Sequence, residues 1–409
     1  MRKLLLTAAA TTILFAAANP AAADTVSDWW EVGNRLQPPG APGSPDQQRA
    51  ASRAALAMFE AVNAIDRRYE SYLGFPAGDV SASQDAAAAT AAYKVLVQHL
   101  PQHKTVLDES YTLAMAGIPD VAAREAGRLI GERAAEAAMA AGGVDPAIPV
   151  IPYRPLTPRP GQWVPTALPQ IESYQYAYRP WVLPSPSALR PPPPPAFDSA
   201  VWARDYEEVR RLGSRTSTER TAEQTLIARY RQAFDVAPSL RLAAEAPNRK
   251  PVQNARMFAI YQMAFDDAAM AMAEAKAHYD YWRPITAIRN GADDGNDATP
   301  PVADWTPLLS TPNFAEYPCG HCVVAAAIAE VMEAEVGPRP ASGVRVASLV
   351  IPNAVVQVLP SWDEWSQQVS DSRIYAGVHF RFSNEAGQQI GQGAARLVLD
   401  KVMRPLPRR

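Results

Sequence analysis

The chain has 409 residues, of which 39 are basic and 42 acidic, and its net charge is −3 at pH 7. This length is sufficient for one large hydrophobic core or two moderate ones. The mild acidity, without a basic stripe interleaved with aromatic residues, gives no support for nucleic-acid binding.

The first residues are typical of an export signal. Arg2 and Lys3 precede an apolar stretch over residues 4–18, and an A-x-A pattern that ends at Ala23 offers a cleavage site. The apolar stretch is shorter than the ~20 residues that a membrane-spanning helix needs. We therefore predict a signal peptide at residues 1–23, a secreted or periplasmic mature protein, and no integral membrane segment after cleavage.

The mature chain is predicted to be all-α, because strand-like alternation is scarce along it. Two sequences, SPDQ at residues 44–47 and SWDE at residues 361–364, are typical of capping boxes at helix starts. The expected helices cover residues 45–69, 86–99, 104–115, 120–141, 199–212, 217–234, 252–281, 319–335, 361–375 and 383–403.

Residues 145–196 differ from the flanking segments by their proline content. They hold sixteen of the 39 prolines, and neither a helix nor a central strand tolerates that density. A flexible linker is the ordinary interpretation, but the interleaved aromatic residues Trp163, Tyr174, Tyr176, Tyr178 and Trp181 are unlike a solvated linker. We predict an extended strap between an N-terminal helical part (24–144) and a C-terminal helical part (197–409), together forming one structural unit.

Three short patches in the last third of the chain concentrate groups that bind an anion. They are residues 276–284 (KAHYDYWRP), 318–321 (PCGH) and 372–380 (SRIYAGVHF). A tetrahedral oxyanion leaves water only if many charge-assisted donors converge on it. Lys276, Arg283 and Arg373 would supply those donors, and His321 and His379 would transfer protons or form a bond.

The spacing within the first patch predicts that Lys276 and Arg283 share one face of a helix, because seven residues make nearly two turns. Pro284 would end or kink that helix. In the third patch, Arg373 and His379 would point about 120° apart on an unbroken helix, and Gly377 permits a break that returns His379 toward Arg373. The ordinary alternative for the first patch is a salt-bridged helix surface. For the third patch it is the end of a helix with a buried structural histidine.

The second patch precedes a predicted helix, whose first amide groups are natural anion donors. Gly320 would let the backbone approach an anion closely, whereas the ordinary alternative for His321 is packing at the helix start. The two cysteines, Cys319 and Cys322, exclude a disulfide framework but leave open a local disulfide or two thiols. CGHC is also a thiol–disulfide exchange motif, although a thioredoxin-like unit requires a βαβ context and the flanks here are predicted helical.

The three patches resemble the motifs K-x6-RP, P-S-G-H and S-R-x5-H of the vanadium-dependent haloperoxidase branch of the PAP2 (type 2 phosphatidic acid phosphatase) superfamily. The resemblance implies an all-α fold of two packed helical bundles. It also implies that Lys276, Arg283, Cys319, Gly320 and Arg373 bind the oxygens of vanadate or phosphate. His379 would be the axial vanadium ligand, or the phosphate-accepting nucleophile, and His321 its acid–base partner.

Two positions depart from the family pattern. Cys319 replaces the serine, and a thiol donates hydrogen bonds weakly. Ser383 stands where the family often has an aspartate, four residues after the last histidine, which would orient the imidazole. Ser383 is expected to cap the final helix, and Glu385 is a candidate to supply the missing carboxylate.

These observations favour an exported haloperoxidase that uses vanadate as cofactor and oxidises a halide with hydrogen peroxide. The alternative within the superfamily is an acid phosphatase that hydrolyses phosphomonoesters through a phosphohistidine and needs no cofactor. Further alternatives are a thiol–disulfide oxidoreductase and a non-catalytic anion-binding homologue.

Overall fold

The computed structural model of the chain describes residues 25–36, 45–145, 159–168, 170 and 175–407. These residues are mostly helical, which confirms the all-α class. The predicted signal peptide and the predicted cap at Ser44 lie outside them. The α-helices are α1 (Thr25–Arg35), α2 (Pro45–Ile65), α3 (Gln84–His99), α4 (Lys104–Ala116), α5 (Val121–Ala140), α6 (Ala200–Leu212), α7 (Ala222–Tyr230), α8 (Ala237–Ala244), α9 (Pro251–Tyr279), α10 (Pro284–Arg289), α11 (Gly320–Val336), α12 (Trp362–Tyr375) and α13 (Arg381–Lys401).

Most predicted helices lie within two residues of the observed bounds, with two exceptions. The helix expected over 45–69 ends at Ile65, because the Asn63 side chain turns the chain back by bonding both the amide and the carbonyl of Tyr69. The helix expected over 217–234 begins only at Ala222, where Thr221 and Gln224 form a reciprocal capping box. Helices α1, α8 and α10 were not predicted.

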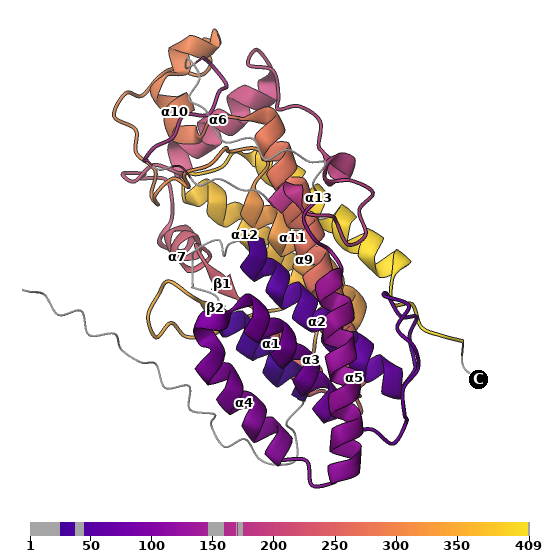
Figure 1. Cartoon of the computed structure of the whole chain (residues 1–409). Coiled ribbons are helices and arrows are strands. Elements are labelled where there is room, and N and C mark those ends of the chain that lie inside the picture. Colours follow the sequence, from indigo (N-terminus) through magenta and orange to yellow (C-terminus); the bar gives the residue numbers. More distant parts are fainter. Residues whose placement is uncertain (1–24, 37–44, 146–158, 169, 171–174, 408–409) are drawn as a thin grey trace, which may run out of the picture.

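Helix α9 packs against α2 and also against α11 and α13. Figure 1 shows α1–α5 gathered at one end of the molecule and α6 and α10 at the other, with α9 running between them. Because it is surrounded, α9 buries residues around its whole circumference. One large apolar core is shared by α1–α5, α9 and α11–α13. The division at residues 144 and 196 stays a prediction.

Helices α11 and α13 approach each other through glycine. A Cβ on Gly387 would lie 2.6 Å from the Cys319 carbonyl oxygen, and one on Gly391 would lie 2.1 Å from that of Val323. Since real Cβ atoms do not come this close to backbone atoms, only glycine allows the two helices to meet at this distance. The start of α11 is thereby fixed against the first turns of α13.

A small antiparallel sheet packs at the edge of the helices and contributes Val344, Val346 and Leu359 to the same core. It consists of β1 (Phe234–Asp235), β2 (Val344–Ser348) and β3 (Gln357–Leu359), in that order across the sheet. Among the described residues, no helix combines the length and the apolar character needed to cross a bilayer.

The described part of the proline-rich segment packs against the helices, as predicted for the strap. Trp163, Tyr178 and Trp181 are buried, whereas Tyr174 lies outside the described residues. The anchor is Asp267 on α9, whose carboxylate accepts the backbone amides of three consecutive strap residues, Trp181, Val182 and Leu183, at 2.7, 2.7 and 3.0 Å.

We expect Asp267→Ala to lower the free energy of unfolding by about 3 kcal/mol, since it leaves three amides, two of them buried, without their charged acceptor. Urea unfolding at pH 8 measures this effect, because burial raises the pKa of Asp267 to about 6 and the carboxylate is ionised there. Asp304→Ala, which removes an exposed carboxylate, is the matched control. Equal loss in the two variants would show that Asp267 does not anchor the strap.

Candidate anion-binding site

Lys276 lies in the last turn of α9 and is buried. Its Nζ donates to the carbonyl oxygens of Ala315 and Glu316, at 2.9 and 2.7 Å. These bonds attach the segment before α11 to the end of α9. Burial, followed by repulsion from Arg283, lowers the pKa of Lys276 well below its usual range.

Arg283 does not share a helix with Lys276, so that prediction was wrong. Helix α9 ends at Tyr279, and Asp280 follows in the left-handed region at φ 42°. Pro284 occupies the first turn of α10 instead of ending α9, and Arg283 is the residue before it. The two cations are brought together by the turn between α9 and α10.

The Arg283 guanidinium is fully buried and is fixed by three contacts. Its Nε donates to the Phe314 carbonyl at 2.8 Å, and its Nη1 donates to the Val378 carbonyl at 2.9 Å and faces His379 Nε2 at 3.1 Å. Its Nη2 is buried without a hydrogen-bond partner among the described residues. The Phe314 ring lies 4.9 Å from the Arg283 Cζ and 5.3 Å from the Lys276 Nζ, measured to its centroid.

Arg373 and His379 are brought together as predicted by a break at Gly377. Helix α12 ends at Tyr375, and Gly377 follows at φ 76°, where its close contact with the Gly213 carbonyl leaves no space for a Cβ. Arg373 is 3% exposed, and its Nε and Nη1 atoms are buried without hydrogen-bond partners among the described residues. Burial lowers the pKa of Arg373 to about 10.

His321 lies in the first turn of α11, and its ring only partly reaches the surface. Its Nε2 lies 2.9 Å from the Gln232 carbonyl oxygen. Because a carbonyl only accepts, Nε2 carries the proton and Nδ1 is the nitrogen left to exchange one. Burial and the nearby Arg373 lower the pKa of His321 to about 3, so the ring is neutral around pH 7.

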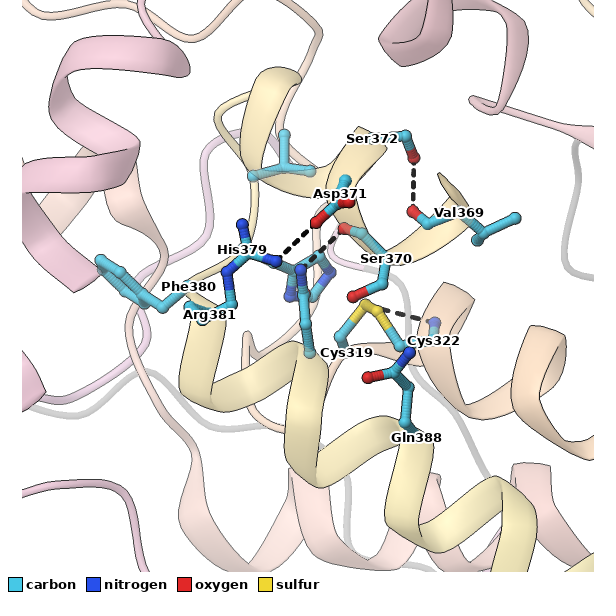
Figure 2. The surroundings of a disulfide bond; sticks show 12 residues. Cys319, Cys322, Val369, Ser370, Asp371, Ser372, His379, Phe380, Arg381 and Gln388 are labelled. Carbon is cyan, nitrogen blue, oxygen red and sulfur yellow. Dashed lines mark hydrogen bonds and ion pairs between the residues drawn. A yellow bond between two sulfur atoms is a disulfide. The ribbon is translucent and has the colours of Figure 1, made fainter. Parts of the chain in front are cut away.

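Cys319 precedes α11 and forms a disulfide with Cys322; both residues are buried. The Cys319 sulfur also accepts the Cys322 amide, at 3.3 Å, at the start of the helix. Figure 2 shows this disulfide below the end of α12, with His379 drawn nearby. A disulfide sulfur carries no proton, so the oxidised pair does not donate a hydrogen bond at the position of the family serine. Gly320 packs against α9, where an added Cβ would lie 2.7 Å from the Met272 sulfur.

Glu316 was not predicted, although it lies at the centre of this cluster. It is fully buried, and its Oε1 lies 2.8 Å from His379 Nδ1 and accepts the Phe380 amide at 3.1 Å. Burial raises the pKa of Glu316 to about 7, against the opposing effects of Arg283 and Lys276. The sequence signal was an acidic residue immediately before the YPCGH stretch, and its distance from His379 along the chain concealed the contact.

The carboxylate beside His379 is therefore that of Glu316, whereas Glu385 is exposed. The expectation that Ser383 caps the final helix was also wrong. Helix α13 begins two residues earlier, at Arg381, and its first amides are accepted by carboxylates from distant segments. The Phe380 amide bonds Glu316, and the Phe382 amide bonds Asp205 at 2.7 Å.

The arrangement is electrostatically suited to an anion. The pKa of His379 lies well below its usual range, first because of burial and then because Arg283, Lys276, Arg373 and His321 are all close enough to repel a proton. Three buried N–H-bearing atoms, Nη2 of Arg283 with Nε and Nη1 of Arg373, have no acceptor among the residues that the structure describes. Buried cationic donors of this kind, close enough to affect one another, fit a multiply charged oxyanion such as vanadate or phosphate.

Comparison with known proteins finds similarity to vanadium-dependent haloperoxidases. Residues 256–407 match the family model of the VCPO second helical-bundle domain. The structure described as the first bacterial vanadium-dependent iodoperoxidase is similar with a TM-score of 0.76 at 22% identity, covering 94% of this chain and 96% of that chain. An apo-type bacterial vanadium-dependent chloroperoxidase gives 0.69 at 18% identity, covering 88% and 94%. A search of curated proteins finds no significant match.

The chain has the vanadium haloperoxidase fold. The resemblance drawn from the three patches is thus supported along most of the chain. All seven residues that were predicted for the site lie inside the segment that matches the VCPO domain. At these identities the similarity establishes the haloperoxidase fold, and the chemistry has to be argued from the residues.

The vanadium haloperoxidase fold also bears on the CGHC motif. A helix follows the two cysteines, and within the described residues the strands form only a small antiparallel sheet, without the βαβ context of a thioredoxin-like unit. Both sulfurs belong to buried residues, which hinders attack by an external thiolate. These observations disfavour a thiol–disulfide oxidoreductase.

We expect Cys319→Ser to bind phosphate up to about tenfold more tightly than Cys322→Ser. Both variants open the same disulfide, but only the first places a hydroxyl donor at position 319, and one such bond contributes about 1 kcal/mol. Isothermal titration calorimetry of the two proteins measures the difference. Equal affinities would mean that the side chain at position 319 does not contact the anion.

Proposed function

We propose that this chain is an exported vanadium-dependent haloperoxidase, in which Lys276, Arg283 and Arg373 bind vanadate and hydrogen peroxide oxidises a halide. The observation that carries the proposal is the set of buried guanidinium N–H groups of Arg283 and Arg373 that have no hydrogen-bond partner in the described part of the chain and belong to the cations near His379. Burying these cations without partners is costly, and an oxyanion would satisfy them. The fold similarity supports the haloperoxidase over other anion-binding functions. The sequence of residues 1–23 supports export.

His379 is proposed to ligate vanadium through Nε2. The carboxylate of Glu316 accepts from Nδ1, so Nδ1 carries the proton and Nε2 keeps its lone pair. Bound vanadate would supply Lewis-acid activation of hydrogen peroxide. The cations of the chain hold the charge of the anion, and Phe314 covers Lys276 and Arg283 on one side. His321, with Nδ1 left to exchange a proton, is placed to serve as the acid–base group.

A phosphatase is the second candidate, and the same His379 geometry favours it. A neutral imidazole with a free Nε2 lone pair is a nucleophile that can attack phosphorus. The phosphoryl group would then be bound to His379 while the leaving alcohol takes its proton from solvent, and the unprotonated Nδ1 of His321 would accept a proton from the water that hydrolyses the phosphohistidine. Arg283 and Arg373 would hold the remaining phosphate oxygens in either reaction.

The deciding experiment starts from purified protein loaded with orthovanadate. We expect uptake of one vanadate per chain, followed by peroxide consumption that requires iodide, bromide or chloride, with halogenation of a dye as readout. Loaded protein that consumes no peroxide in the presence of any halide would overturn the proposal. Hydrolysis of a chromogenic phosphate ester that is abolished by vanadate would instead establish the phosphatase in the same pocket.

A further inference from the structure

Glu316 contacts both His379 and the residue that follows it. Its Oε1 lies 2.8 Å from His379 Nδ1 and accepts the Phe380 amide at 3.1 Å. The imidazole is thus connected to the start of α13 through one carboxylate oxygen. The backbone of Glu316 is also held in place, because its carbonyl oxygen accepts a hydrogen bond from Lys276 Nζ at 2.7 Å. Neither Glu316 nor His379 has room to rotate freely, because both are buried.

This contact determines the tautomer of His379. An ionised carboxylate oxygen only accepts hydrogen bonds, so Oε1 accepts one from the Phe380 amide and a second from His379. The proton of a neutral His379 ring is therefore on Nδ1. The opposite nitrogen, Nε2, faces the Arg283 Nη1, which only donates, at 3.1 Å. Arg283 is in turn fixed by the carbonyls of Phe314 and Val378. Both ring nitrogens are therefore restrained, and the lone pair of Nε2 lies on the side of the cations.

A buried carboxylate is a costly way to stabilise a fold, because its removal from water is only partly offset by its partners. The nearest cations, Lys276 and Arg283, belong to the anion-binding set and would share their charge with a bound anion. The oxygen Oε2 has no hydrogen-bond partner within the described residues that satisfies normal geometry. The carboxylate is thus better explained by what it does to His379 than by its contribution to stability.

We propose that Glu316 is the positioning residue of His379, holding Nδ1 protonated so that Nε2 is presented to the bound anion. It supplies, from the segment before α11, the carboxylate that the family motif places at position 383. Carboxylate partners of this kind typically change affinity or activity by about 10- to 100-fold when they are removed. The inference rests on the proposed function for the role of Nε2, but it applies equally to the haloperoxidase and to the phosphatase.

The test compares Glu316→Ala, Glu316→Gln and the double variant Glu316→Ala/Ser383→Asp. The chain has five histidines, so selective 15N-histidine labelling makes it practical to identify which nitrogen of His379 is protonated. We expect the wild-type protein to show protonated Nδ1 alone and Glu316→Ala to show both tautomers. Phosphate affinity, measured by calorimetry, should fall by about 10- to 100-fold in Glu316→Ala and less in Glu316→Gln, whose amide oxygen still accepts.

The double variant separates positioning from a merely structural role. The Ser383 side chain lies close enough to Glu316 to favour its charged form, so an aspartate there is expected to restore protonated Nδ1 and most of the phosphate affinity. The inference is overturned if Glu316→Ala keeps the wild-type tautomer and affinity, or if affinity falls while the tautomer stays unchanged. Because neither readout involves halide or peroxide, a correct tautomer result with no halide oxidation would reject only the haloperoxidase proposal.

Discussion

Arg373→Met is expected to make the anion-free protein more stable and to weaken anion binding by about 100-fold. The guanidinium is buried, and two of its N–H-bearing atoms have no partner among the described residues. Replacing such a cation by an apolar side chain of similar length typically raises the free energy of unfolding by about 1–3 kcal/mol. The same change removes charge-assisted bonds to the anion of about 1.5–3 kcal/mol each, and 1.4 kcal/mol corresponds to a tenfold change in affinity.

Urea unfolding without anion and calorimetric titration with phosphate measure the two effects on the same sample. Arg231→Met is a matched control. Arg231 is also a buried arginine with one nitrogen that lacks a partner within the described chain, but it donates to Gln368 and is not among the cations that lower the pKa of His379. We expect the control to lose stability and to keep its phosphate affinity. An Arg373→Met protein that binds phosphate as tightly as the wild type would remove Arg373 from the site.

The second large effect is expected from His379→Ala, which should reduce turnover by at least about 1,000-fold in halide oxidation or in phosphoester hydrolysis. In both proposed reactions the ring nitrogen would form the bond to the central atom, and loss of such a group is not compensated by its neighbours. Phosphate binding should weaken by no more than about tenfold, because Lys276, Arg283 and Arg373 still supply the charge.

Steady-state rates and phosphate affinity together test this separation of binding from turnover. His278→Ala is the appropriate control, since His278 is exposed and lies two residues from Lys276 without belonging to the cluster. Removal of His379 leaves Glu316 without its imidazole partner, so the fold of the variant should be checked by circular dichroism. Full activity in His379→Ala would eliminate the bond-forming role of this residue.

The sequence was informative where local rules decide the structure. Helix starts at Ser361 and Ser199 follow from side chains that accept an amide three residues later, and these are readable from spacing alone. The break at Gly377 was also readable, because few other residues adopt its positive φ. The strap was identified by aromatic residues among prolines, which a solvated linker does not need.

The predictions were wrong where contacts with distant segments, instead of neighbouring residues in the sequence, determine the structure. The start of α13 is held by carboxylates from distant segments: Glu316 accepts the amide of Phe380, just before the helix, and Asp205 accepts that of Phe382. No residue near Phe380 in the sequence indicates these two partners. Lys276 and Arg283 share a site through a turn at Asp280 instead of a helix face. The seven-residue spacing therefore predicted that the two cations lie close together, but for the wrong geometrical reason.

The glycines at the contact of α11 and α13 have a consequence for the two histidines proposed to react. His321 belongs to the first turn of α11, and His379 directly precedes α13. Gly387 and Gly391 bring the main chains into direct contact at these two positions, without a side chain of α13 between them. The separation of the two imidazoles is consequently a property of the scaffold, and evolution can reshape the walls around the substrate without retuning it.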